Sequence, residues 1–286
     1  MIRIESPLLA AQINPLGAEL SSLRDAGGRE LMNPADPAYW TAKAPLLFPI
    51  VGGLRDDRYW LGERSYEMAR HGLARRLTFD LVAQSAERVL LRLTDSEATR
   101  LAYPFAFTFE AEYAIEGTAL TMTLSATNSG DTDLPVSLGY HPAFAWPLPY
   151  GQAREAHRIL FDADEPDDLA TLEDGLIGGA RPSSVEGRLL QLEDALFEAD
   201  ALVWLNARSR GCLYGAPEGP QLRIDWSEMP ALGIWTKPGA PFVCIEPWDG
   251  HADPAGFYGE IWDKPGIHRL APGERLSRWM RVDVQG

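Results

Sequence analysis

One carboxylate in the chain is placed where it could exchange a proton with a bound ligand. Glu246 follows the apolar residues 242–245 and precedes Pro247, which has no N–H and is expected to end a buried strand at this point. A carboxylate at a strand end that is partly removed from water has a raised pKa and can serve as a general base. A glutamate on an edge strand that faces water would fit this stretch equally well.

Two histidines lie in comparable surroundings. His141 follows another apolar strand, residues 135–139, and His71 stands beside Gly72, where a polar ligand could approach the backbone. Each histidine alone is more often a hydrogen-bonded structural residue. Together with Glu246 they favour a site for paired general acid and base catalysis.

Other types of site lack their motifs. The chain has no glycine-rich nucleotide loop, no GxSxG nucleophile motif, no HExxH motif and no Cys/His cluster. The triplet Asp249-x-His251-x-Asp253 could chelate a metal, but the surrounding glycine and proline favour an acidic loop, so no metal site is expected. His157 and His268 lie among charged loop residues and are expected to be exposed.

Composition limits the choice of partners. The 286 residues carry a net charge of −15, spread along the chain, which disfavours nucleic acid and anionic membranes. The two distant cysteines need no disulfide framework, and no apolar run reaches the roughly 20 residues of a membrane helix. The N-terminus reads as a strand rather than a secretion signal. A cytoplasmic protein is expected, either a monomer or a homodimer.

Apolar and polar residues alternate along most of the chain, which predicts strands joined by short turns. No linker divides it, so residues 1–286 are expected to form one all-β domain of stacked sheets. The only candidate helices are residues 189–197, whose leucines fit a helical stripe, and residues 37–41. The nine tryptophans and nine tyrosines would suit the apolar faces of sugar rings, although most should lie in the core.

Five motifs follow one another along the sequence: NPLGAEL at 14–20, WTAKAPLLFPIVG at 40–52, RHGLAR at 70–75, GYHPAF at 139–144 and CIEPW at 244–248. In these motifs and their order, the chain resembles the aldose 1-epimerases over nearly its whole length. It is most similar to a shorter bacterial branch marked by HGxAR, GxHPxF and EPWxG. The resemblance implies a galactose mutarotase-like antiparallel β-supersandwich with few short helices and an open cleft across one sheet.

The resemblance also implies roles in converting the α and β anomers of a sugar. Glu246 would be the general base on the anomeric hydroxyl, and His141 the general acid on the ring oxygen. His71 would hydrogen-bond the ring oxygen or a neighbouring hydroxyl and share the work of the acid. No cofactor is implied, because nothing is oxidised. The remaining substrate-binding residues would be Arg75, Asp200 and Trp248.

The chain departs from the family pattern at one point. Where the family has Gly-Arg-Leu, this sequence has Gly52-Gly53-Leu54, and Arg55 follows. Arg55 would then have to reach the sugar from a shifted loop, unless the substrate differs or the protein only binds. The leading hypothesis is an aldose 1-epimerase acting on a hexose or a hexose phosphate, for which Arg55, Arg70, Arg75 and Arg76 could form a basic cluster. The alternatives are a non-catalytic carbohydrate-binding or sugar-sensing protein and, third, a glycoside hydrolase.

Overall fold

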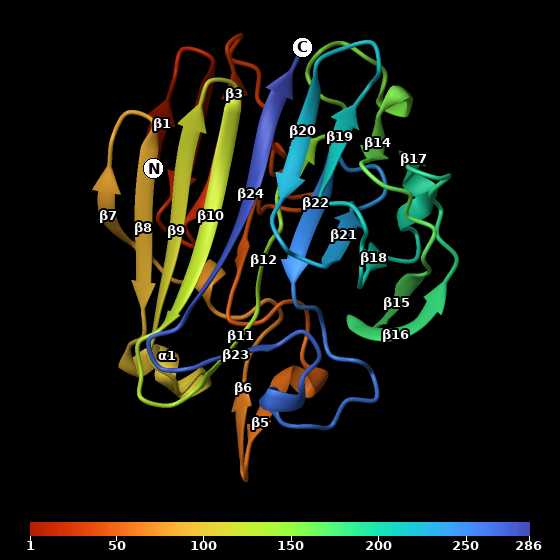
Figure 1. Cartoon of the computed structure of the whole chain (residues 1–286). Helices are drawn as coiled ribbons and strands as arrows, with labels where there is room; N and C mark the ends of the chain where they lie inside the picture. Colours follow the sequence, from red (N-terminus) through yellow and green to blue (C-terminus); the bar gives the residue numbers. More distant parts are fainter.

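The computed structural model describes all of residues 1–286 and consists mainly of antiparallel strands in two large sheets (Figure 1). The all-β prediction is confirmed. The first large sheet has nine strands, which are, in spatial order, β17 (Leu189–Gln191), β14 (Arg158–Phe161), β19 (Gly211–Gly215), β20 (Gln221–Trp226), β24 (Arg275–Gln285), β10 (Ala119–Asn128), β9 (Phe107–Glu116), β8 (Arg88–Thr94) and β7 (Asp80–Gln84).

The second large sheet has eight strands and carries the site described below. In order these are β16 (Leu176–Arg181), β15 (Leu169–Glu173), β18 (Leu202–Trp204), β21 (Ala231–Trp235), β22 (Phe242–Asp249), β12 (Leu138–Tyr140) and β4 (Leu46–Leu47), with β13 (Ala143–Ala145) also beside β22. The hairpin β15–β16 forms the edge, and its register with β18 consists of one pair, Ala170 with Val203. Ile177 of this hairpin also forms a bridge with Pro254, so the loop after β22 helps to hold the edge.

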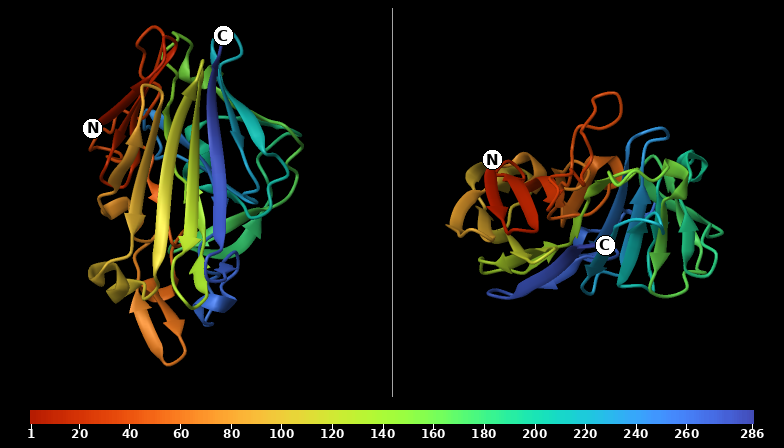
Figure 2. Two further views of the ribbon diagram at one scale, coloured as in Figure 1. Left: turned by 60° about the vertical axis from the view of Figure 1, so that its left-hand side comes forward. Right: turned by 90° about the horizontal axis from the view of Figure 1, so that it is seen from above.

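Three smaller sheets complete the fold. They are β1 (Ile2–Glu5), β2 (Leu9–Asn14) and β3 (Glu19–Asp25); β11 (Leu134–Val136) with β23 (His268–Leu270); and the projecting hairpin of β5 (Arg58–Leu61) and β6 (Arg64–Glu67). In Figure 2 the N-terminal strands lie against one side of the nine-stranded sheet. The Tyr113 hydroxyl of β9 donates a hydrogen bond to the Ala18 carbonyl just before β3, which ties these two layers together.

One continuous core of 63 buried residues runs between the layers, and both large sheets contribute to it. Strands that face the core on one side alternate in burial, as β2 and β20 do, which is the pattern that period-2 sequences predict. Strand β22 is different because all eight of its residues are buried. Val243 and Ile245 face the core, whereas Cys244 and Trp248 belong to separate apolar clusters on the opposite face.

Both helix predictions were wrong. Residues 189–197 divide into strand β17 and a short 3-10 helix, Asp194–Phe197, because Leu190 is drawn into the ladder with β14. Residues 37–39 form only a turn. The one α-helix, α1 (Glu97–Ala102), was not predicted, although the side chains of Ser96 and Thr99 form a capping box at its start. No helix has the length and apolar character needed to cross a membrane.

Candidate functional site

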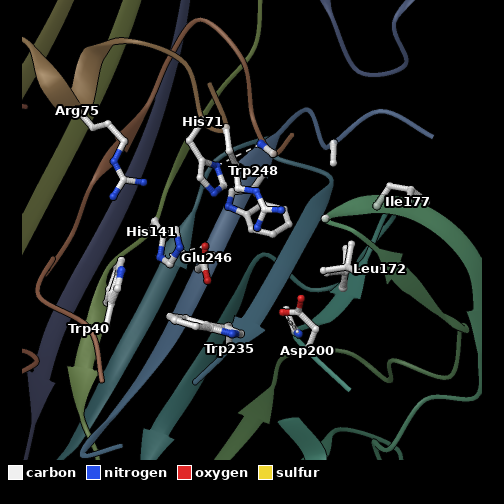
Figure 3. Close-up of a pocket in the computed structure, with 16 residues that line it drawn as sticks. Trp40, His71, Arg75, His141, Leu172, Ile177, Asp200, Trp235, Glu246 and Trp248 are labelled. Carbon is white, nitrogen blue, oxygen red and sulfur yellow. Dashed lines mark hydrogen bonds and ion pairs between the residues drawn. The ribbon is translucent and has the colours of Figure 1, made fainter. Parts of the chain in front are cut away.

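A cavity of about 420 Å³ lies on the face of the eight-stranded sheet that is turned away from the core (Figure 3). Six of the seven residues predicted to form the site line this cavity, although they come from distant parts of the chain. The side chains brought together are His71, Arg75, His141, Asp200, Glu246 and Trp248. A single hexose fits a space of this size.

Glu246 lies within strand β22 and not at its end, so that prediction was wrong. The strand continues through Pro247 to Asp249 because its neighbour on one side is interrupted. β12 pairs with β22 at Trp248 and Asp249, and β13 pairs with it only up to Cys244. Pro247 falls in the gap, where no partner requires the missing N–H.

The same gap brings His141 to Glu246. His141 and Pro142 form the break between β12 and β13, so the imidazole lies on the cavity face of the sheet. Its Nδ1 is 3.2 Å from Oε2 of Glu246. The ring also stacks on Trp40, with ring centroids 4.9 Å apart. Pro247 in β22 and Pro142 in the break thus help to place this candidate acid–base pair.

Glycines make room for Trp248 beside this pair. A Cβ at Gly139 would lie 2.7 Å from the Trp248 ring, and a Cβ at Gly233 would lie 2.5 Å from it. Gly139 is on β12 and Gly233 is on β21, so the indole lies flat over both neighbouring strands. It forms an apolar surface next to Glu246, of the kind on which a sugar ring can stack.

Three polar atoms around the pair are buried and lack a hydrogen bond of regular geometry, although two of them, Nδ1 of His141 and Oε2 of Glu246, face each other as an ion pair. They are Nδ1 of His141, Oε2 of Glu246 and Nε1 of Trp248. Glu246 itself is only 2 % exposed. Buried polar groups in native proteins are nearly always hydrogen-bonded, and exceptions concentrate where a ligand supplies the missing bonds. The cavity floor therefore suits a ligand that both donates and accepts hydrogen bonds.

Burial favours the uncharged forms of both catalytic candidates. It raises the pKa of Glu246 well above its usual value, and Asp200 adds to this effect. Burial, followed by the charge of Arg75, lowers the pKa of His141 to about 3. Proximity alone would favour the charged forms of both groups, whereas desolvation outweighs their mutual attraction here. The neutral pair and the charged pair hold the same number of protons, so one transfer interconverts them.

The structure shows which ring nitrogen of His71 accepts a hydrogen bond and which one carries the proton. Its Nδ1 accepts a hydrogen bond from the Gly52 N–H at 3.1 Å, so the proton of the neutral ring is on Nε2. Burial lowers the pKa of His71 well below its usual value, which keeps the ring neutral. Its backbone is held at φ 66°, a strained conformation for a non-glycine residue. His71 is therefore placed as a hydrogen-bond donor through Nε2, and its predicted share in the work of the acid stays a prediction.

Asp200 and Arg75 form opposite walls of the cavity (Figure 3). Asp200 also has a strained backbone, with φ 83°, and its carboxylate accepts a hydrogen bond from the Ala201 N–H at 2.7 Å. The charge of Arg75 acts on both His141 and Glu246. The cavity thus presents a hydrogen-bond acceptor on one wall and a donor on the other.

The prediction that Arg55 reaches the substrate was wrong. Its guanidinium hydrogen-bonds the Ala255 carbonyl and stacks over the Tyr258 ring, 4.1 Å from the ring centroid. These contacts hold it outside the cavity. Arg70 lines the cavity instead, and a Cβ at Gly53 would point toward its Nε at 3.9 Å. A long side chain at position 53 and the guanidinium of Arg70 would compete for the same space.

Two groups of residues could be considered as metal ligands. In the Asp249–Asp253 loop, Asp253 forms an ion pair with Lys264 at 2.8 Å, and His251 contacts the Ala252 carbonyl at 2.8 Å. These side chains already have partners, as expected for a structural loop. Ligand atoms of His141, Cys244 and Glu246 lie within 4.8 Å of one another, but burial raises the pKa of the Cys244 thiol well above its usual value, which disfavours metal binding.

Sequence reasoning did not identify several residues that line the cavity. Trp40 lies inside a quoted motif, which was a usable signal. Trp235 and the hairpin residues Leu172 and Ile177 carry no local signal, because only the folded sheet brings them to the cavity. The full set that was not predicted to bind is Trp40, Gly52, Leu172, Gly175, Ile177, Ala201, Val203, Trp235 and Ala252.

The sequence matches the family described as "Aldose 1-epimerase" over residues 1–282. Protein LacX, plasmid, from Lactococcus lactis subsp. lactis is 30% identical over 285 residues, which cover 95% of each chain. Among solved structures, a galactose mutarotase-like protein from Lactobacillus casei superposes with a TM-score of 0.93 at 28% identity over 100% of both chains. A galactose mutarotase related enzyme from Lactobacillus acidophilus gives 0.92 at 29% identity, covering 100% of this chain and 97% of that one. The fold is therefore galactose mutarotase-like, and the chain belongs to the aldose 1-epimerase family.

Proposed function

We propose that the protein is an aldose 1-epimerase that interconverts the α and β anomers of a hexose or hexose derivative. Family membership supports an isomerase of the epimerase type. The choice of residues rests on one observation: a buried glutamate and a histidine lie 3.2 Å apart on the floor of a hexose-sized cavity.

Each proton transfer has a candidate group. Glu246 takes the proton from the anomeric hydroxyl while His141 gives a proton to the ring oxygen. The C1–O5 bond breaks, its electron pair goes to O5, and a carbonyl forms at C1. Rotation about the C1–C2 bond exposes the other face of the carbonyl, and the reverse transfers close the ring as the other anomer. Neither an oxidant nor a metal takes part in this sequence.

Burial sets the resting state of the pair, in which neither group carries a charge. The reactive state has a Glu246 carboxylate and a His141 imidazolium, and the pair reaches it from the neutral state by transferring one proton to His141. Proton exchange with the sugar then returns both groups to the neutral forms that burial favours. Ring opening itself therefore converts the charged pair back into the neutral pair.

His71, Asp200 and Arg75 hold the sugar during these steps. The fixed Nε2–H of His71 donates to a ring or hydroxyl oxygen, and the carboxylate of Asp200 accepts from a hydroxyl on the other wall. Trp248, Trp40 and Trp235 provide apolar faces for the ring. Polar contacts on the walls and stacking on the floor would hold C1 and O5 over the acid–base pair.

Polarimetry on freshly dissolved α-glucose, α-galactose and glucose 6-phosphate tests this proposal. An epimerase accelerates the approach to anomeric equilibrium in proportion to enzyme concentration for at least one of these sugars. A protein that only binds gives a calorimetric signal with the same sugars while the rate stays at its buffer value. That second result would reject the catalytic proposal and leave the sugar-binding one.

A further inference from the structure

Trp40 lies on one face of the His141 imidazole (Figure 3). The two ring centroids are 4.9 Å apart and the ring planes differ by 28°, so the rings are stacked. Trp235 stands nearly perpendicular to both rings, with its centroid 5.5 Å from that of Trp40 and 6.0 Å from that of His141. Phe242 packs against both tryptophans. The candidate acid is therefore covered by an indole that two further aromatic rings hold in place.

Hydrogen bonds join the segment that carries Trp40 to the strand that follows His141. The Asn33 N–H donates to the Ala143 carbonyl at 2.9 Å, and the Ala143 N–H donates to the Lys43 carbonyl at 2.8 Å. Asn33 is buried, and its side-chain amide donates to the Trp40 carbonyl at 3.2 Å. The segment is thus bonded to β13 on both sides of Trp40, which fixes the indole relative to the imidazole.

The protonated form of His141 receives little support from most of the titratable groups around it. Burial and the charge of Arg75 both oppose a positive charge at this place. His71 is neutral, with its ring 5.6 Å away, and burial raises the pKa of the Cys244 thiol, which stays protonated. Glu246, at 3.2 Å, attracts the imidazolium only after its own proton has moved to the ring. The stacked indole acts on the imidazolium wherever that proton lies.

An indole face distinguishes the two forms of an imidazole. The π-system of tryptophan carries a negative face, which attracts a cation within about 6 Å of the ring centroid, and the attraction is stronger where water is excluded. A neutral imidazole has no net charge for this face to attract. The stack therefore stabilises the imidazolium relative to the neutral ring, which lowers the cost of moving the proton from Glu246 to His141.

We propose that Trp40 is a positioning residue of the reaction: its indole face stabilises the protonated His141 and so raises the population of the charged pair from which the sugar ring opens. This inference rests on the proposed epimerase function and adds a residue to its mechanism. It also separates the tasks of two tryptophans. Trp248 presents its ring to the sugar, whereas one face of Trp40 is occupied by the imidazole.

Kinetics of two variants test the proposal. Trp40→Leu keeps an apolar side chain but has no π-system, and Trp40→Phe keeps an aromatic face. Exchange NMR gives kcat and KM on whichever of α-glucose, α-galactose and glucose 6-phosphate the wild-type protein anomerises. Trp40→Leu should lower kcat by about 3- to 30-fold, the range expected for one cation–π contact. Trp40→Phe should restore part of this loss, and KM should change by less than about twofold in both variants.

A matched control removes an indole elsewhere. Trp279 is exposed on β24, in the other large sheet, and Trp279→Leu should leave kcat and KM unchanged. Circular dichroism checks the fold of each variant. A loss that appears in KM, with kcat unchanged, would overturn the inference and make Trp40 a sugar-binding surface. Equal kcat values for Trp40→Leu and Trp40→Phe would also overturn it, because the aromatic face would then have no effect.

A titration tests the same contact without catalysis. Arg75→Ala removes a charge that lowers the pKa of His141, which brings the titration of the ring to a higher pH. In this background the ¹³C shift of the His141 ring, followed from pH 3 to 7, gives its proton affinity. Adding Trp40→Leu should weaken proton binding by about 3- to 30-fold, and adding Trp40→Phe should weaken it less.

The two measurements separate failure of the inference from failure of the proposed function. If none of the sugars is anomerised, the epimerase proposal fails, but a lower proton affinity in the Leu variant would retain the effect of Trp40 on His141. If a sugar is anomerised and the proton affinity is the same with Trp, Phe and Leu at position 40, the epimerase proposal stands and the role of Trp40 is rejected.

Discussion

Strand β22 carries two carboxylates three residues apart, and each faces a histidine, but their surroundings differ. Asp249 lies 2.8 Å from Nε2 of His268 and 2.7 Å from Nε of Arg278. Glu246 lies 3.2 Å from His141 and has no salt bridge to an arginine or lysine. One carboxylate is neutralised by a fixed cation, while the other has only a titratable partner and borders a cavity.

The comparison distinguishes a structural brace from a reactive pair. A carboxylate with an arginine and a histidine beside it links the strands that supply its partners, here β22, β23 and β24. A buried carboxylate without a fixed cation is unstable as an ion, so it binds a proton strongly once its own proton has passed to its histidine partner. A histidine next to a carboxylate is therefore not sufficient to identify a site.

The largest expected effect is on catalysis at the reactive pair. Glu246→Gln should lower kcat/KM for anomerisation by at least about a hundredfold, because an amide cannot accept the hydroxyl proton. Polarimetry or exchange NMR measures the loss, and circular dichroism checks the fold. Asp249→Asn is the matched control on the same strand, and its kcat/KM should fall far less. Retained turnover in Glu246→Gln would remove this residue from the mechanism.

The structural brace, the ion pair of Asp249 with Arg278, should have the largest effect on the free energy of unfolding. Asp249→Asn leaves Arg278 without its counter-charge in a buried place and should lower the free energy of unfolding by about 3 kcal/mol. Urea unfolding at pH 7, compared with the wild-type protein, gives this value. A change close to zero would mean that the pair is no brace and that the contrast with Glu246 has another origin.

His71 should have an intermediate effect, on substrate binding rather than on proton transfer. His71→Ala removes one neutral hydrogen-bond donor and should lower kcat/KM by about tenfold, since such a bond contributes about 1 kcal/mol. The pH dependence of kcat/KM should keep its shape, because a neutral His71 does not titrate in the working range. A shifted pH profile would show that this histidine takes part in proton transfer after all.

The smallest expected effect is a gain in stability, opposite in sign to the loss expected for Asp249→Asn. Glu246→Gln should raise the free energy of unfolding by about 1 kcal/mol at pH 7, because a buried carboxyl with a raised pKa disfavours the folded ion. The folded wild-type protein holds this proton more tightly than the unfolded chain does. Below pH 4.5, the pKa of this group in the unfolded chain, the carboxyl costs the wild-type protein no stability. The free energy of unfolding then falls as the pH rises toward the raised pKa of the folded protein.

The difference between Glu246→Gln and the wild-type protein should thus vanish below about pH 4.5 and grow as the pH rises. Urea unfolding at pH 4, 5, 6 and 7 measures it. A gain in stability that is the same at every pH would show that packing, and not the ionisation of Glu246, causes it.

Much of the fold was predictable, because the alternation of apolar and polar residues in strands such as β2 and β20 is visible in the local sequence. The family motifs also marked the acid–base pair. Pro247 misled the prediction, since whether a proline ends a strand depends on whether a neighbouring strand needs its N–H, and the interruption opposite it lies about a hundred residues earlier in the chain. Long-range pairing of this kind is not visible in a local window.

Individual side chains showed the same limit. His157 was expected to be exposed, but it is 1 % exposed, and both ring nitrogens have backbone partners at 2.9 Å, the N–H of Leu148 and the carbonyl of Ala153. Arg55 was expected at the substrate, but contacts with Ala255 and Tyr258 hold it elsewhere. In both cases the deciding partner comes from another loop, which composition and spacing do not reveal.

The edge hairpin β15–β16 supplies Leu172, Gly175 and Ile177 to the cavity, although a single residue pair registers it with β18. Glu246 stands instead on the central strand β22, and His141 lies in the break between β12 and β13 beside it. The groups proposed for the chemistry and the residues of this wall thus come from different parts of the sheet. Substitutions in the hairpin can therefore change which molecules the pocket admits while Glu246 and His141 keep their geometry.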